Sequence, residues 1–306
     1  MKNNLINKIN KLKKNHNAVV LAHNYQIGEV QDIADYTGDS LGLSIEASKT
    51  TAKLIVFCGV NFMAETAAII SIDKKVVVPE INAGCPMADM ITVTALKKLK
   101  DQNPKAKVVC YVNSGADIKA ESDICCTSAN AIRVVESLTN TEEIIFVPDK
   151  YLGSYVASKV KDKRIILWQG FCPTHAKILP EHIMTAKDKY PGAKVLVHPE
   201  CRPETIALAD YVLSTGGMLK LAKESGSKEF ILATEIGILH SLKRQNPEKN
   251  FYPALASAIC PNMKLTTLEK ILWSLEDLIT EVRVPPEIAA KARLAIEKML
   301  AVGRQV

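Results

Sequence analysis

The chain has 306 residues, 47% of them hydrophobic, and its 39 Lys and Arg against 33 Asp and Glu give a formal net charge of +6. This composition predicts a globular protein of two or three small units, and it argues against a membrane protein because no apolar run approaches the roughly 18 residues of a transmembrane helix. The lysines are scattered, without a basic block or interleaved aromatic residues, so no nucleic-acid partner is expected.

The first part of the chain alternates helical and strand-like segments. Residues 1–14 mix Leu and Ile with Asn and Lys, which is typical of a helix and not of a signal peptide, so we expect a cytoplasmic protein. In chain order we expect helices over 5–16, 31–36, 40–48 and 61–70, and strands over 18–22, 53–58 and 75–78. Cys85 closes this segment.

The same plan recurs twice. A second segment is expected to have a leading helix at 95–100 and strands at 107–111, 143–147 and 164–168. A third is expected to have a leading helix at 181–189 and strands at 194–197, 229–233 and, less clearly marked, 251–256. Two helices, at 267–281 and 287–302, complete the chain.

A Cys-Pro pair recurs with regular spacing. Cys85, Cys172 and Cys260 are each followed by proline, and they lie 87 and 88 residues apart. Three other sets keep this period and carry reactive side chains: the predicted strand-end residues His23, Tyr111 and His198, the residues two positions later, Tyr25, Asn113 and Glu200, and the hydroxyl residues Ser40, Ser128 and Thr215. A period of this length predicts one folding unit used three times.

The repeat predicts an α/β fold of three αβα units with small parallel sheets, related by a pseudo-threefold axis. We expect the units to span residues 1–85, 86–172 and 173–262, with the C-terminal helices at 263–306 packed on the first unit. Ligands of parallel sheets bind beyond the carboxyl ends of the strands. The active site, with any metal cluster, is therefore expected at the central axis.

The three repeated cysteines are candidate metal ligands. Each is expected in a turn before a helix, where the helix dipole lowers the pKa of a thiol and favours the thiolate. Three thiolates fit either a zinc ion with a bound water or a [4Fe–4S] cluster with one open iron. Because catalytic zinc usually has His or carboxylate ligands, the cluster is the preferred interpretation. The other five cysteines are expected to be structural.

The remaining periodic residues predict a polar binding site. Ser40, Ser128 and Thr215 are predicted N-caps, and three helix N-termini aimed at one cavity would bind carboxylates or a phosphate. General acid–base capacity comes from the strand-end set, and His175, three residues after Cys172, is expected to join the site. A substrate with several acidic groups is expected.

Several local motifs closely resemble the quinolinate synthase family, over residues 17–300. They are Ala-His-Asn-Tyr-Gln at 22–26, Asp-Tyr-Thr-Gly-Asp-Ser at 35–40, Gly-Cys-Pro-Met-Ala-Asp at 84–89, Tyr-Val-Asn-Ser at 111–114, Gly-Phe-Cys-Pro-Thr-His at 170–175, His-Pro-Glu-Cys at 198–201 and Ser-Thr-Gly-Gly-Met at 214–218. The resemblance implies an iron–sulfur enzyme of NAD biosynthesis. Such an enzyme condenses iminosuccinate, supplied by L-aspartate oxidase, with dihydroxyacetone phosphate to give quinolinate, phosphate and water.

The resemblance also implies roles for individual residues. Cys85, Cys172 and Cys260 would hold one [4Fe–4S] cluster per chain, whose open iron acts as a Lewis acid. The substrate-binding residues would be His23, Ser40, Tyr111, Asn113, Ser128, His175, His198, Glu200 and Thr215, with His175 near the phosphate. Tyr25 and Glu200, assisted by His23 and His198, would be the catalytic residues for proton transfer.

Two other enzyme types share a threefold layout with one cysteine per unit: the hydroxymethylbutenyl diphosphate reductase of isoprenoid synthesis and the diphthamide-forming enzyme that cleaves S-adenosylmethionine. The motifs around His23, Asn113 and His198 argue against both. A non-catalytic metal-binding or ligand-binding protein is the alternative from a different class.

Overall fold

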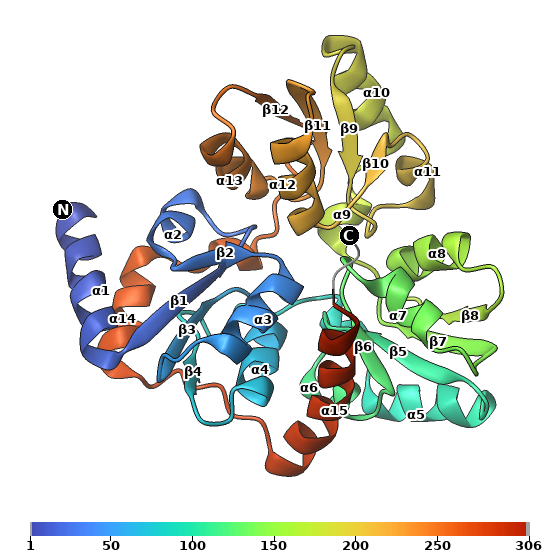
Figure 1. Cartoon of the computed structure of the whole chain (residues 1–306), viewed down its shortest axis with the longest axis horizontal. Helices are drawn as coiled ribbons and strands as arrows, with labels where there is room; N and C mark the ends of the chain where they lie inside the picture. The colour runs from blue at the N-terminus through green and yellow to red at the C-terminus, as the bar shows by residue number, and fades with distance from the viewer. Residues whose placement is uncertain (1, 304–306) are drawn as a thin grey trace.

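Three small parallel sheets form the framework of the protein, and Figure 1 shows them arranged around a common centre. The computed structural model describes residues 2–303. Each sheet has four strands, and the spatial order of the strands within it is the same every time: β2-β1-β3-β4, β6-β5-β7-β8 and β10-β9-β11-β12. All ladders within the sheets are parallel, which confirms the predicted α/β fold of three αβα units.

The elements follow one another in the same pattern in each unit. The first contains α1 (Lys2–His16), β1 (Ala18–His23), α2 (Gly28–Ile33), β2 (Tyr36–Gly38), α3 (Ser40–Lys49), β3 (Leu54–Cys58), α4 (Asn61–Ile70) and β4 (Lys75–Val77). The second contains η1 (Ala88–Met90), α5 (Val93–Gln102), β5 (Lys107–Tyr111), α6 (Ala116–Ala120), β6 (Ile124–Cys126), α7 (Ala131–Ser137), β7 (Glu143–Val147), α8 (Lys150–Lys159) and β8 (Arg164–Leu167). The third contains α9 (Pro173–Ala176), α10 (Pro180–Lys189), β9 (Lys194–Val197), α11 (Pro203–Ile206), β10 (Tyr211–Val212), α12 (Thr215–Glu224), β11 (Glu229–Ala233), α13 (Ile238–Gln245), β12 (Asn250–Pro253) and η2 (Asn262–Lys264).

Each sheet has one strand more than the sequence predicts. The additional strands, β2, β6 and β10, are edge strands of two or three residues, too short to show a periodic pattern. The expected helix over 31–36 is wrong at its end: α2 stops at Ile33 and Tyr36 opens β2.

The two C-terminal helices lie on different neighbours. α14 (Leu268–Asp277) packs against α1 of the first unit, whereas α15 (Pro286–Val302) lies against α4 and, more extensively, against α6 and β6 of the second unit. Buried α15 residues such as Ile296 and Met299 join the largest hydrophobic cluster, which runs through all three units. None of the helices in the described part of the chain is long and apolar enough to span a bilayer.

A repeated aspartate shows that the three units share their local structure. Before each edge strand, an Asp carboxylate accepts a hydrogen bond from a backbone amide of the first strand of its sheet and pairs with a lysine. The amide bonds are Val20 to Asp35 at 2.7 Å, Val108 to Asp123 at 2.8 Å and Val195 to Asp210 at 2.8 Å. The same contact therefore ties the edge strand to the sheet in every unit.

We expect Asp210→Asn to lower the free energy of unfolding near pH 7 by about 1 kcal/mol. Burial alone would raise the pKa of Asp210, but the Val195 amide and Lys194 outweigh it and lower the pKa. The stabilisation is present above the unfolded-state pKa and is lost as the pH falls through the folded-state value. Urea titrations at several pH values should show a deficit that shrinks in acid, whereas the exposed Asp188→Asn should show none.

Candidate active site

One cavity lies where the three units meet. Its lining includes every residue that the sequence marked as a candidate: His23, Tyr25, Ser40, Cys85, Tyr111, Asn113, Ser128, Cys172, His175, His198, Glu200, Thr215 and Cys260. It encloses about 680 Å³ of space outside the protein atoms, counting its open mouth. The lining brings together residues from all three units.

The strand ends carry most of these side chains to the cavity. His23 and Tyr111 are the last residues of β1 and β5, and His198 directly follows β9. These three strands occupy the same place in their sheets. Equivalent residues from three units therefore face one another.

The prediction that Ser40, Ser128 and Thr215 are helix N-caps is wrong, because a nearby residue is the N-cap in each case. The N-caps of α3 and α12 are Asp39 and Ser214, whose side chains accept from the amides of Gly42 and Gly217 at 2.8 and 3.2 Å. Asn130 is the cap residue of α7. Ser40 and Thr215 are the first residues of their helices, so their hydroxyls are not used for capping.

Two histidines have the same local geometry. The Nδ1 atom of His23 accepts from the Tyr25 amide at 3.2 Å, and that of His198 accepts from the Glu200 amide at 3.4 Å. Burial lowers the pKa of His23 to about 4 and that of His198 to about 3, so both rings are neutral at pH 7. With Nδ1 accepting, the hydrogen of the His23 ring sits on Nε2, where it can be donated to an acidic ligand. His198 Nδ1 also lies 3.3 Å from Glu200 Oε2.

Glu200 is the most highly connected group in the cavity. Its Oε2 atom lies 2.8 Å from His175 Nδ1 and its Oε1 atom accepts from Asn113 Nδ2 at 3.2 Å. Burial alone would raise the pKa of Glu200, but His175, His198 and the Tyr111 hydroxyl hold it below its ordinary value. Glu200 is therefore a buried carboxylate held by donors from two units.

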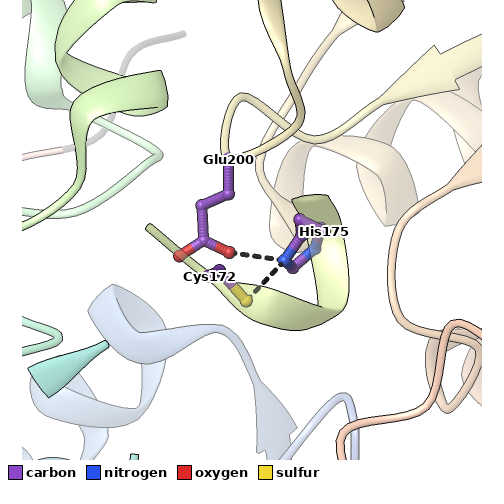
Figure 2. A group of neighbouring side chains, drawn as sticks. All are labelled: Cys172, His175 and Glu200. Atoms are coloured by element: carbon purple, nitrogen blue, oxygen red, sulfur yellow. Dashed lines mark hydrogen bonds and ion pairs between the residues drawn. The ribbon is translucent and has the colours of Figure 1, made fainter. Parts of the chain in front are cut away.

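His175 connects this carboxylate to a cysteine. Figure 2 shows His175 Nδ1 between Glu200 Oε2 and the Cys172 sulfur, 3.1 Å away. The ligand atoms of these three residues lie within 4.8 Å of one another, a spacing that could hold a metal ion. The carbonyl Oδ1 of Asn113 is buried and has no protein partner, so it can accept a hydrogen bond from a ligand.

The three repeated cysteines are free thiols, and their donor set suits a soft metal centre. Backbone amides that follow each cysteine favour its thiolate and lower its pKa, as occurs around iron–sulfur ligands. The expected lowering of their pKa values is wrong for the metal-free cavity. Burial raises the pKa of Cys85 to about 12 and raises those of Cys172 and Cys260, because it outweighs the amides.

Sequence reasoning missed several lining or neighbouring residues. Asp39 could have been found, since Asp39, Thr127 and Ser214 keep the same 88- and 87-residue spacing. Glu235 accepts from the Cys260 amide at 3.2 Å and pairs with Lys264 at 2.8 Å, but it has no counterpart in the period. Its role in holding the Cys260 turn is visible only in three dimensions.

The fold and the cavity define a triplicated α/β protein whose central site combines thiols, imidazoles and a buried carboxylate, which is the arrangement of a metal-centred enzyme. The family model for quinolinate synthetase A protein matches residues 7–301. The chain belongs to this family.

Relatives that match over nearly their full length carry the name quinolinate synthase. The chain is 57% identical to a quinolinate synthase of Dehalococcoides mccartyi over 96% of this chain and 97% of the relative. It is 55% identical to that of Methanosarcina barkeri, with 97% of each chain covered, and 54% identical to that of Pelobacter propionicus, with 99% and 100% covered.

Proposed function

We propose that this protein is a quinolinate synthase of NAD biosynthesis. It condenses iminosuccinate with dihydroxyacetone phosphate and releases quinolinate, phosphate and two waters. Family membership and the names of full-length relatives support the reaction. The single structural observation that carries it is the cavity, where donors suited to a diacid surround a buried carboxylate base.

The diacid is bound by donors from three units. The Nε2–H group of His23, the ring of His198 and the hydroxyls of Ser40, Ser128 and Thr215 bind its carboxylates, with Tyr111 beside them. The free Oδ1 of Asn113 accepts from its nitrogen. Because these groups come from separate elements, they bind a ligand only when all three units are packed together.

Cys85, Cys172 and Cys260 would hold one [4Fe–4S] cluster, which supplies a Lewis acid that binds substrate oxygen and assists loss of water. Their three free thiols with amide donors fit such a cluster. The set of Cys172, His175 and Glu200 is the alternative, which would suit a single zinc ion.

Proton transfer belongs to Tyr25 and Glu200, with His23 and His198 beside them. Glu200 takes a proton from carbon during isomerisation, and the hydroxyl of Tyr25 exchanges protons with substrate oxygens. His175, whose Nδ1 is bound to Glu200, lies beside the phosphate.

In this proposal the reaction takes place in the cytoplasm. Iminosuccinate is supplied by L-aspartate oxidase, and neither nucleic acid nor membrane takes part. All eight cysteines are free, which suits the reducing cytoplasm. The division into residues 1–85, 86–172 and 173–262 is supported by the sheets, each of which lies within one segment.

The direct test is an anaerobic assay of the purified protein with iminosuccinate and dihydroxyacetone phosphate. We expect quinolinate and phosphate in equal amounts, and about four irons per chain with a brown colour. Omitting dihydroxyacetone phosphate is the control and should give no quinolinate. Zinc in place of iron would contradict the cluster, and an iron-loaded protein that makes no quinolinate would contradict the activity.

A further inference from the structure

An asparagine of the first unit bonds to a cavity hydroxyl of the third. The Nδ2 atom of Asn24 lies 3.0 Å from Thr215 Oγ1, and the two residues are only 0% and 2% exposed. Thr215 lines the central cavity, whereas Asn24 does not. The bond therefore reaches the ligand site from behind, across the boundary between two units.

The backbone is held at both ends of this bond. Asn24 follows the last residue of β1, its amide donates to the Gly38 carbonyl at 3.0 Å, and its carbonyl accepts from Gln31 Nε2 at 3.1 Å. Thr215 is the first residue of α12, directly after the N-cap Ser214. The distance between the two side chains is thus set by the packing of the first unit against the third.

The direction of the hydrogen bond follows from the atoms that are left unpaired. Asn24 Oδ1 is buried and has no partner among residues 2–303. A reversed side-chain amide would leave both of its N–H groups unpaired, and buried unpaired N–H groups are rarer than unpaired carbonyl oxygens. Asn24 Nδ2 is therefore the donor and Thr215 Oγ1 the acceptor.

This bond leaves the hydrogen of the Thr215 hydroxyl for a ligand. A threonine hydroxyl has one hydrogen and two lone pairs, and the Asn24 amide uses one lone pair. The described residues provide no other hydrogen-bond partner for this hydroxyl. An acceptor in the cavity, such as a carboxylate oxygen, suits it better than a second donor.

The other two cavity hydroxyls lack such a donor. Ser40 and Ser128 correspond to Thr215 in the repeat, and within the described part of the chain neither hydroxyl makes a hydrogen bond to the protein. The residues that correspond to the asparagine are Val112 and Pro199, whose side chains cannot donate. Of the three hydroxyls, that of Thr215 is the one held in a fixed hydrogen-bonding state.

We infer that Asn24 is a positioning residue for substrate binding: its amide fixes the Thr215 hydroxyl so that this hydroxyl donates to a carboxylate of the diacid. This rests on the proposed quinolinate synthase activity. Without the amide, the Thr215 hydroxyl can turn its hydrogen away from the ligand. The effect falls on KM for iminosuccinate and not on kcat, because a bond to a carboxylate that does not react is equally strong in the ground state and the transition state.

The test compares Asn24→Ala, which removes the amide, with Asn24→Asp, which keeps the size but replaces the donor with an acceptor. We expect Asn24→Ala to raise KM for iminosuccinate about 3- to 10-fold, the range of one hydrogen bond, with kcat little changed. Asn24→Asp should raise KM further, because the new carboxylate accepts the Thr215 hydrogen and repels the diacid. A purely structural role predicts the opposite order, since aspartate fills the space and alanine does not.

A second measurement does not depend on turnover. Succinate, a diacid without the imine nitrogen, should bind both variants more weakly than the wild type, by the factors seen in KM. In a Thr215→Val background, Asn24→Ala should have no further effect on either quantity, because the hydroxyl to be fixed is absent.

Asn246→Asp is the matched control. Asn246 is also buried, but its Nδ2 donates to the Leu242 carbonyl at 3.0 Å and it does not line the cavity. KM and succinate binding should stay at wild-type values. Melting temperature and iron content are recorded for every variant, so that unfolded or iron-free protein is not counted.

Three results would overturn the inference: unchanged KM in both Asn24 variants, a milder effect of aspartate than of alanine, or additive losses in the Thr215→Val background. Failure of the proposed activity is a separate result. If the wild type makes no quinolinate but both variants bind succinate more weakly than it does, the activity is rejected, and Asn24 is retained as a positioning residue of a diacid site.

Discussion

Glu200→Gln is expected to lower kcat for quinolinate formation by about 10²- to 10⁴-fold, the contribution typical of a positioned general base. The carboxylate accepts from His175 Nδ1 through one oxygen and from Asn113 through the other. An amide keeps the size but loses the charge, and its NH₂ group opposes one of these donors. The measurement is steady-state turnover under anaerobic conditions.

The matched control is Glu204→Gln, an exposed glutamate four residues further on. It should keep wild-type activity, and both variants should keep wild-type iron content because Glu200 is not a proposed cluster ligand. Near-normal turnover in Glu200→Gln would remove Glu200 from proton transfer. Loss of iron in that variant would instead favour Glu200 as a metal ligand with Cys172 and His175.

Alanine at Cys85, Cys172 or Cys260 is expected to abolish cluster binding, with complete loss of quinolinate formation. Each proposed ligand comes from a different unit, so no neighbouring repeat can replace it. Iron and sulfide analysis, together with the visible absorbance of the cluster, measures the result without relying on activity.

Cys58→Ala provides the comparison, because Cys58 is a buried thiol at the end of β3 that does not line the cavity. Burial raises its pKa far above the ordinary value, as expected of an inert core cysteine. It should keep a full cluster. A full cluster in any of the three ligand variants would contradict the assignment.

The sequence predicted the site better than it predicted the edges of the sheets. The period of 87 and 88 residues identified side chains from separate units that the fold brings into one cavity, because equivalent strands end at the same place. Strands of two or three residues, such as β10, depend on pairing with a longer neighbour and leave no pattern of their own. The N-caps of two helices were predicted one residue too late. The side chains of Asp39 and Ser214, not those of the residues after them, accept hydrogen bonds from the amides of the first turn.

Other parts of the site are accessible only in three dimensions. Glu235 has no counterpart in the other units, so the repeat could not identify it. The thiol pKa values depend on burial, which the local order of strand, cysteine and helix does not reveal. Local motifs predict which residues lie together in the cavity. The pKa values of those residues depend on their burial, which is determined by the whole fold.

The equivalent positions on the three strands carry unlike side chains: imidazole, phenol and imidazole at the strand ends, and phenol, amide and carboxylate two residues later. If the three units carried identical side chains around the cavity, a ligand could bind in any of three orientations related by the pseudo-threefold axis. Here Glu200 occurs on only one wall and Asn113 on only one other. A ligand that pairs with both Glu200 and Asn113 is therefore expected to have one favoured orientation, so that the divergence of the three units makes a pseudo-symmetric cavity stereochemically selective.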